Sequence, residues 1–151
     1  MPDEIRLRNY IAADLGRLLA LDKACFDQEI AYGEGEMRAY LSHSGAICVV
    51  AEKGKEVAGF ILLHRLKRAT GHVITIDIAP AFRRHGLGRR LMQVGEEQLL
   101  EEGYRQVFLE VAVNNLGAIT FYRGLGYQVL RTLPRYYPGA LDGLLMGKRL
   151  D

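Results

Sequence analysis

Apolar and polar positions in the first half of the chain predict one strand, two helices and three further strands. Residues 5–10 alternate between apolar and polar side chains, which is typical of a half-buried strand. Apolar residues then recur at steps of three and four over 14–26, which predicts an amphipathic helix. The prediction for this half is a strand at 5–10, helices at 14–26 and 37–41, and strands at 46–52, 57–64 and 73–79. Turns at 53–56 and 70–71 join the last three strands into a meander.

The second half continues the alternation of helices and strands. Gly103 and Gly126 each follow an apolar helical pattern and are predicted to end a helix, and Asn114-Asn115 is predicted to cap the shorter one. This half is predicted to hold a helix at 87–102, a strand at 107–113, a helix ending at 125, and strands at 127–131 and 144–148. The resulting order, β α α β β β α β α β β, predicts an α/β fold: one domain over 1–151, with a mixed sheet and helices on both faces.

Composition and charge narrow the classes of function. Apolar residues make up 49% and charged residues 25%, as in ordinary globular domains, and a net charge of +2 does not indicate a nucleic-acid partner. No apolar run is long enough to cross a membrane, and Asp3 and Glu4 stand where a signal peptide would be apolar. Cys25 and Cys48 form no CxxC pair, and the four histidines show no metal-ligand spacing. We therefore expect a cytoplasmic protein without a metal.

A glycine-containing turn after an apolar strand is the first candidate for chemistry. The strand at 74–79 ends at Pro80, and Gly86 and Gly88 flank the start of a helix at Leu87. A strand, glycine turn and helix in this order direct backbone N–H groups at an anion. Four cationic side chains crowd the positive end of that helix: Arg83, Arg84, Arg89 and Arg90. This unfavourable placement predicts a negatively charged ligand, with a solvated basic turn as the alternative.

Two common phosphate motifs are excluded at this turn. No Gly-Lys-Ser/Thr follows it, so it is not a P-loop. Leu91 occupies the third glycine position of a dinucleotide-binding fingerprint, which excludes that motif as well.

Three further features could take part in catalysis. Glu110 lies inside an apolar strand, where burial would raise its pKa toward that of a general base; the alternative is a solvent-facing position. Tyr122 lies seven residues after Asn115, so both can line one side of a helix, and Tyr122 could give a proton to a leaving group or simply pack in the core. Tyr136 and Tyr137 form either a lid over an extended substrate or an ordinary packed loop.

Together these motifs resemble the GNAT superfamily of acyl-CoA-dependent N-acetyltransferases. Within it they are most similar to the RimI-type ribosomal-protein-alanine acetyltransferases and the related protein N-terminal acetyltransferases. The resemblance covers the whole chain and rests on three segments, 83–89, 109–127 and 135–138.

The resemblance implies acetyl-CoA as the cofactor, Glu110 as the general base and Tyr122 as the donor of a proton to the departing thiolate. The cofactor-binding residues that it implies are Ile76, Asp77, Ile78, Arg83, Arg84, His85, Gly86, Leu87, Gly88, Arg89 and Asn115. The acceptor-binding residues that it implies are Phe26, Ile30, Tyr32, Tyr136 and Tyr137.

This chain departs from the family pattern at two places. Phe26-Asp27-Gln28 stands where bacterial members often carry Phe-Pro-Trp, in a loop that helps to choose the acceptor. Asp77 replaces a small apolar residue, and we expect it to lie beside Glu110 and tune it.

The chemistry of acetyl transfer favours an α-amine as the acceptor. An α-amine with a pKa near 8 is about a tenth neutral at pH 7, whereas a lysine side chain is less than about 0.1% neutral. Neither cysteine has a neighbouring histidine motif, so we expect direct attack in a ternary complex. The leading hypothesis is transfer to a protein or peptide N-terminus. The alternatives are a small-molecule amine, a lysine side chain, or a non-catalytic acyl-CoA-binding module; a homodimer stays open.

Overall fold

The structure, a computed structural model, describes residues 4–27 and 30–151. The sequence expectations attached to Asp3 and Gln28 lie outside these residues. The strands are β1 (Arg6–Asn9), β2 (Ala46–Lys53), β3 (Glu56–Leu66), β4 (Thr70–Ile78), β5 (Gln106–Ala112), β6 (Gln128–Tyr137) and β7 (Leu141–Arg149). The α-helices are α1 (Leu15–Cys25), α2 (Glu34–Ser42), α3 (Leu87–Glu101) and α4 (Leu116–Gly124).

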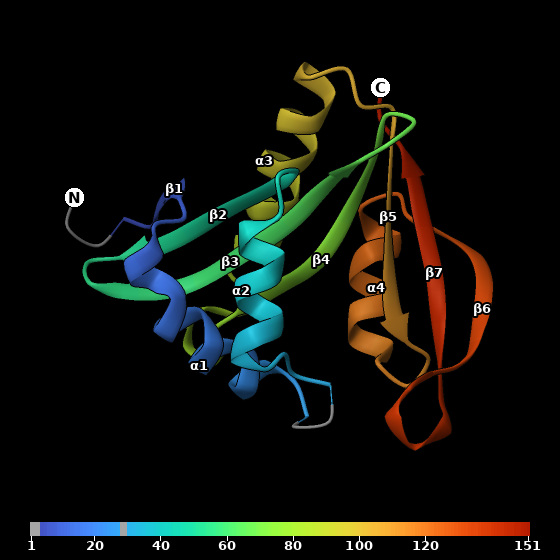
Figure 1. Ribbon diagram of the computed structural model, residues 1–151, viewed down its shortest axis with the longest axis horizontal. Coiled ribbons are helices and arrows are strands. Elements are labelled where there is room, and N and C mark those ends of the chain that lie inside the picture. The colour runs from blue at the N-terminus through green and yellow to red at the C-terminus, as the bar shows by residue number, and fades with distance from the viewer. Residues whose placement is uncertain (1–3, 28–29) are drawn as a thin grey trace.

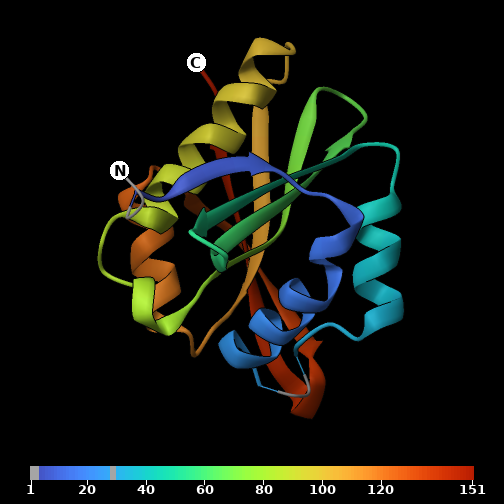
Figure 2. The ribbon, with the colours of Figure 1, turned by 90° about the vertical axis from the view of Figure 1, so that its left-hand side faces the viewer.

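All seven strands join one mixed sheet, in the order β1-β2-β3-β4-β5-β7-β6. Helices cover both faces of this sheet (Figure 1 and Figure 2). One face carries α1 and α2 over a cluster that includes Leu18, Met37 and Phe60. The other carries α3 and α4 over a larger cluster that includes Leu91 and Leu109. The predicted α/β class and order of elements are therefore confirmed.

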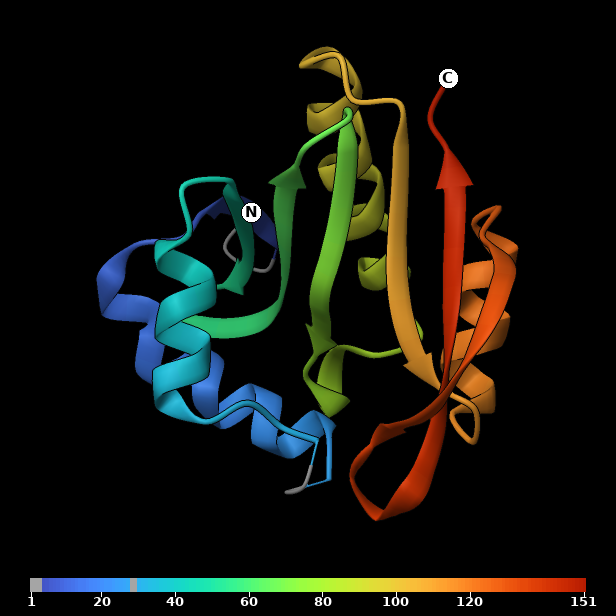
Figure 3. The ribbon, with the colours of Figure 1, turned by 45° about the vertical axis from the view of Figure 1, so that its right-hand side comes forward.

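The two central strands, β4 and β5, pair over only a short stretch. They run parallel and pair at three positions, from Thr70 opposite Gln106 to His72 opposite Phe108. Beyond His72 both strands continue without pairing to each other, and Figure 3 shows them separating toward the lower end of the sheet. The edge of β4 that faces β5 therefore lacks ladder hydrogen bonds after His72. The N–H and C=O groups on this edge need other hydrogen-bond partners.

Helix α2 begins three residues before the predicted start at Met37. Gly33 is its N-cap, and the Glu36 side chain accepts a hydrogen bond from the N–H of Gly33 at 3.2 Å. The polar residues 34–36 belong to the helix because they form its capped, solvated first turn. The predicted polar loop is correspondingly shorter.

The predicted turn at Thr70-Gly71 is wrong, since both residues belong to β4. The chain turns instead at 67–69, where Arg68 and Ala69 adopt positive φ values of 61° and 54°. Gly71 serves packing rather than turning, because a Cβ atom there would lie 2.5 Å from Cδ1 of Leu99.

The last hairpin is longer than predicted. Strand β6 runs through Tyr137, so 134–137 lie in an irregular strand rather than in a hairpin tip. The register shifts between Leu133 and Tyr137, and the tip itself is the 3₁₀ turn Pro138–Ala140. The two tyrosines are thus carried by a strand.

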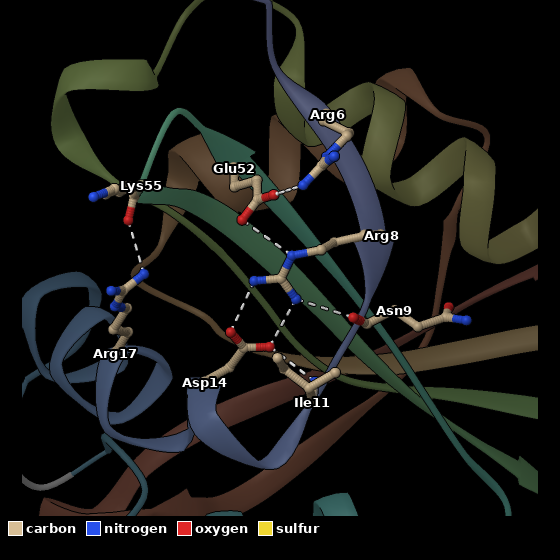
Figure 4. A network of polar contacts seen from close by, with 8 residues as sticks. All are labelled: Arg6, Arg8, Asn9, Ile11, Asp14, Arg17, Glu52 and Lys55. Carbon is tan, nitrogen blue, oxygen red and sulfur yellow. Dashed lines mark hydrogen bonds and ion pairs between the residues drawn. The ribbon is translucent and has the colours of Figure 1, made fainter.

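An ion-pair network ties the edge strand β1 to β2 and to the start of α1 (Figure 4). Arg8 donates to both carboxylate oxygens of Asp14 at 2.8 Å and lies 3.0 Å from Glu52. The same Asp14 carboxylate accepts from the N–H of Ile11 at 2.9 Å. The hydrogen bonds from the Arg8 guanidinium hold the pKa of the Asp14 carboxyl below its ordinary value, although burial of the carboxyl acts in the opposite direction.

Replacing Asp14 by Asn should lower the free energy of unfolding by about 2–3 kcal/mol, because Arg8 loses its charged partner at a buried site. The lowered pKa means that the stabilisation is fully present above the ordinary pKa of an aspartate, about 3.9, and is lost as the pH falls through the folded-state value. Urea unfolding at pH 3 to 7 measures both effects. The exposed helix pair of Glu34 and Arg38 supplies the control, since Glu34→Gln should cost less than about 1 kcal/mol. Equal losses in the two variants would contradict the assignment.

Candidate active site

The glycine turn before α3 presents backbone N–H groups without acceptors. Gly86 is the N-cap of α3 and has a left-handed φ of 79°. Within the part of the chain that the structure describes, the N–H groups of residues 84–89 donate to no protein acceptor. The side chain of Leu87 is buried in the core, so this residue can offer only its backbone to a ligand. Such a cradle fits the anion that the sequence predicts.

The side chains of the turn divide into two groups. Arg84, His85 and Arg89 are exposed and surround the N-terminus of α3. Arg83 instead turns back toward β4, where its Nε donates to the carbonyl of Ile78 at 3.0 Å and its Nη2 lies 3.5 Å from the Cys25 sulfur. The Arg83 side chain thus stabilises the end of β4, and its predicted contact with the cofactor stays a prediction.

Gly88 allows α3 to approach α4 closely. A Cβ atom at this position would lie 3.2 Å from Cζ of Phe121, which is tighter than ordinary van der Waals contact. The second glycine of the motif is therefore explained by helix packing, and the first by backbone conformation.

The unpaired edge of β4 offers the peptide group of Ile76 to the gap beside β5. The N–H of Ala79 donates to the carbonyl of Ala58 on β3. Because backbone groups alternate in direction along an antiparallel strand, the N–H and C=O of Asp77 also face β3. The backbone N–H and C=O groups of Ile76 and Ile78 therefore face away from β3. The Ile78 carbonyl is already engaged by Arg83. Ile76 remains without a ladder partner, which fits its predicted contact with an extended ligand.

Asp77 does not lie beside Glu110, so that expectation is wrong. Its carboxyl group is fully buried on the α1 side of the sheet, where it accepts a hydrogen bond from Thr75 Oγ1 at 2.5 Å. Burial, followed by the neighbouring carboxyl of Asp22, raises the pKa of Asp77 well above its ordinary value. Because its peptide group also faces β3, nothing places Asp77 in the gap. The side chain of Asp77 thus has a structural role, and its predicted contact with the cofactor stays a prediction.

Asp22 and Asp77 together form a buried pair of carboxyl groups. Each has one oxygen, Oδ1 of Asp22 and Oδ2 of Asp77, with no other hydrogen-bond partner in the described residues. The other Asp22 oxygen accepts from the N–H of Tyr32 at 2.7 Å. The two carboxyl groups link α1 to β4, and burial beside Asp22 favours the protonated form of Asp77. The pair also fixes the end of the loop that leads to α2.

Glu110 lies against a histidine that the sequence analysis did not single out. His72 Nε2 is 2.7 Å from Glu110 Oε1, and the two side chains are 20% and 16% exposed. The His72 ring stacks on Phe108 with centroids 4.2 Å apart, which sets its orientation. His72 was missed because its proximity depends on the register between β4 and β5, and no local pattern encodes that register.

Tyr122 is half-buried on α4, and burial is the main cause that raises its pKa, with smaller effects from Asp77 and Tyr137. Its hydroxyl therefore stays protonated at neutral pH, and it makes no hydrogen bond within the described residues. Asn115 caps the same helix by accepting from the N–H of Ala118 at 3.2 Å. Asn115 is exposed, so its amide NH₂ group remains available as a donor to a ligand.

Aromatic side chains surround the Glu110 end of the sheet. Tyr136, which is 51% exposed, meets Tyr137 edge to face at 4.9 Å. Burial raises the pKa of both hydroxyls, and the nearby Glu110 carboxylate raises them further. Tyr32 donates to the carbonyl of Ile74 at 3.3 Å and packs against Tyr40 on α2. Tyr40 from α2 and the two tyrosines of β6 therefore lie near the carboxylate.

The two remaining predicted acceptor residues lie in the connection after α1. Phe26 is the C-cap of α1 and is half-buried. Ile30 is also half-buried, and its N–H donates to the carbonyl of Asp27 at 2.8 Å. Neither makes a hydrogen bond to the carboxylate of Glu110 in the described part of the chain.

Neither cysteine offers a route through a covalent intermediate. Both are unpaired, and burial raises the pKa of the Cys48 thiol to about 12. Among residues 4–27 and 30–151, no cluster of three metal-binding side chains is present. In the same residues no helix is long and apolar enough to span a membrane.

These features define a group-transfer site with an anion cradle, an open strand edge and a carboxylate–histidine pair. The sequence profile described as "Acetyltransferase (GNAT) family" matches residues 15–127, so the chain belongs to this family.

Two curated relatives illustrate the sequence similarity. The N-alpha-acetyltransferase of Sulfurisphaera tokodaii is 29% identical over 159 residues, covering 97% of this chain and 94% of the relative. N-alpha-acetyltransferase 20 of Dictyostelium discoideum is 45% identical over 82 residues, covering 53% of this chain and 47% of the relative. The second match therefore spans about half the length of that relative.

Solved structures share the fold. Ard1 from Thermoplasma volcanium has a TM-score of 0.90 at 21% identity, covering 97% of this chain and 98% of that one. The ribosomal-protein-S18-alanine N-acetyltransferase from Escherichia coli has a TM-score of 0.88 at 20% identity, with 98% and 95% covered. A third, yncA from Salmonella typhimurium with its cofactor acetyl-CoA, has a TM-score of 0.80 at 19% identity, with 97% and 94% covered.

The predicted class, an acyl-CoA-dependent N-acetyltransferase that uses acetyl-CoA, is confirmed at the level of the family. The unsatisfied N–H groups and exposed cations at 84–89 fit the pyrophosphate of that cofactor.

Replacing Gly86 by Ala should weaken the binding of coenzyme A about tenfold, because a Cβ atom at φ 79° forces the turn out of its left-handed conformation. Isothermal titration calorimetry measures this change. Gly54 is the matched control, since it has a φ of 61° in the β2–β3 hairpin and equally open surroundings. Gly54→Ala should cost similar stability in a thermal melt and leave the affinity unchanged. Equal affinities for coenzyme A in both variants would rule out the cradle.

Proposed function

We propose that the protein transfers the acetyl group of acetyl-CoA to the N-terminal α-amine of a polypeptide, with Glu110 as general base and Tyr122 as general acid. The observation that carries this proposal is the Glu110–His72 pair at the point where β4 and β5 separate, flanked by tyrosines.

Four parts of the chain would hold the cofactor. The backbone of 84–89 receives the pyrophosphate, and the exposed side chains of Arg84 and Arg89 add positive charge. The peptide group of Ile76 and the amide of Asn115 offer hydrogen bonds to the pantetheine arm. Acetyl-CoA supplies the acetyl group as a thioester, which an amine attacks directly.

Glu110 would remove the proton that the amine loses during transfer. Its carboxylate is half-buried and adjacent to His72 Nε2 at 2.7 Å, so a proton taken by Glu110 can be shared with the imidazole. A single carboxylate serves an α-amine more readily than a lysine, since more of the α-amine is already neutral. The base chemistry therefore supports an α-amine acceptor.

Tyr122 would supply the proton that the departing thiol needs. Burial raises the pKa of its hydroxyl, which keeps the proton on the oxygen at neutral pH. The hydroxyl makes no competing hydrogen bond in the described residues, so it is available to a ligand in the gap.

The acceptor side supports a polypeptide. Tyr40, Tyr136 and Tyr137 lie near enough to Glu110 for its carboxylate to raise the pKa of each hydroxyl, and Tyr32 packs against Tyr40. Tyrosines suit an extended chain because they combine apolar area with a hydroxyl. The names of the relatives from Sulfurisphaera tokodaii and Dictyostelium discoideum, both N-alpha-acetyltransferases, agree with this assignment.

The proposal is tested with a library of synthetic peptides, acetyl-CoA and mass spectrometry of the products. We expect acetylation at the α-amine and not at internal lysines. Glu110→Gln should reduce kcat by roughly 10²–10⁴-fold and Tyr122→Phe by a factor of about ten or more. Calorimetry should show unchanged affinity for coenzyme A in both variants. Transfer only to lysines or small amines would overturn the choice of acceptor, and full activity of both variants would overturn the catalytic roles.

His72→Phe should reduce kcat by about three- to tenfold and shift the pH profile of kcat/KM, because the ring can still stack on Phe108 but cannot share a proton with Glu110. His64, which bonds the carbonyl of Tyr40, supplies a comparison on the neighbouring strand. His64→Phe should leave the shape of the pH profile unchanged. An identical pH profile for His72→Phe and the unmodified protein would exclude a role for this imidazole.

A further inference from the structure

A groove of about 880 Å³ lies on the face of β5, β7 and β6 that no helix covers. The cluster under α1 and α2 includes no residue of these strands, and α3 and α4 pack on their opposite face. In Figure 3 no helix lies in front of β5 and β7, and α4 lies behind these strands. Glu110 and Tyr136 line one end of the groove, and Thr70 and Arg149 line the other. The groove is therefore continuous with the proposed active site.

The strand register sets the order of side chains along its floor. Glu110 is paired with Leu145, Phe108 with Gly147, and Gln106 with Arg149. Residues two and four positions from Glu110 on the same strand lie about 7 Å and about 13 Å away. The floor thus changes from a carboxylate to an apolar stretch and then to a cationic end.

The apolar stretch is shaped by a leucine that folds over a glycine. A Cβ atom on Gly147 would lie 2.8 Å from Cδ1 of Leu130, so the absence of a side chain makes room for Leu130. Leu130 is nevertheless 59% exposed, and Phe108 lies across the same floor, stacked on His72. This surface offers apolar area to a ligand rather than to the core.

Two arginines give the groove a positive rim. Arg149 and Arg131 both line it and are exposed, and neither forms an ion pair with any residue in the described ranges. Arg131 lies opposite Leu145, in the same cross-strand row as Glu110. Glu110 is the acidic residue among those that line the groove, and its carboxylate already contacts His72 Nε2 at 2.7 Å. The groove therefore complements an acidic ligand.

We propose that this groove binds the second to fifth residues of the acceptor polypeptide and selects apolar side chains at the second or third position and acidic ones at the fourth or fifth. The inference rests on the proposed function, which puts the α-amine at Glu110. An extended chain advances about 3.3–3.6 Å per residue, so two residues reach the level of Phe108 and four reach Arg149. A small-molecule amine would leave most of this surface unused.

The test uses two peptides that differ only at the fourth and fifth positions, which are both glutamate or both lysine, with leucine at the second and third. The unmodified protein should acetylate the glutamate peptide with a kcat/KM about three- to tenfold higher, which is the contribution of one or two exposed ion pairs. The variant Arg149→Glu should reverse that preference through KM, because Arg149 lies at the level of the fourth and fifth positions. Its thermal melt should match that of the unmodified protein, because the side chain is exposed.

Lys55→Glu supplies the matched control, since it makes the same kind of charge change at an exposed hairpin position outside the groove. Its preference between the two peptides should equal that of the unmodified protein. Equal rates for both peptides, or a preference unaltered in Arg149→Glu, would overturn this inference alone. Failure to acetylate the α-amine of any peptide would instead overturn the proposed function on which it rests.

Discussion

The short pairing between β4 and β5 is the constraint on which the site depends. Two neighbouring parallel strands that share only three paired positions leave their remaining edges without ladder partners. His72 is the last residue of β4 in that ladder, and Glu110 lies two residues beyond its counterpart Phe108. The carboxylate–imidazole pair therefore forms where the strands begin to separate, next to the free peptide group of Ile76. The same geometry that leaves backbone groups open also brings the acid–base groups beside them.

A strand with one open edge needs other contacts to hold it in place, and the end of β4 obtains them from side chains. Arg83 bonds the Ile78 carbonyl, Tyr32 bonds the Ile74 carbonyl, and the buried carboxyl of Asp77 meets Asp22 on α1. These contacts replace ladder hydrogen bonds without closing the gap between the strands. They also connect the cofactor side of the sheet to the loop before α2, which belongs to the acceptor side. The buried carboxyl pair therefore supports both halves of the proposed site.

Local chemistry made much of this architecture predictable from sequence. The cap at Asn115 and the stops at Gly103 and Gly126 each follow from one residue and its neighbours, and the structure contains all three. Features that depend on strand register could not be predicted in the same way. The contact of His72 with Glu110, the burial of Asp77 against α1 and the row that ends at Arg149 all require knowing which residues lie opposite each other. Sequence patterns locate a strand, but pairing between strands decides which side chains meet.

Amide hydrogen exchange measured with and without acetyl-CoA tests most directly the claim that the open edge of β4 and the glycine turn hold the cofactor. The account predicts slower exchange in the segments 74–79 and 84–89 when acetyl-CoA is present. Exchange in the β2–β3 hairpin at 53–56 should not change, because that hairpin lies outside the proposed cofactor contacts. Unchanged exchange in both site segments at saturating acetyl-CoA would contradict the account.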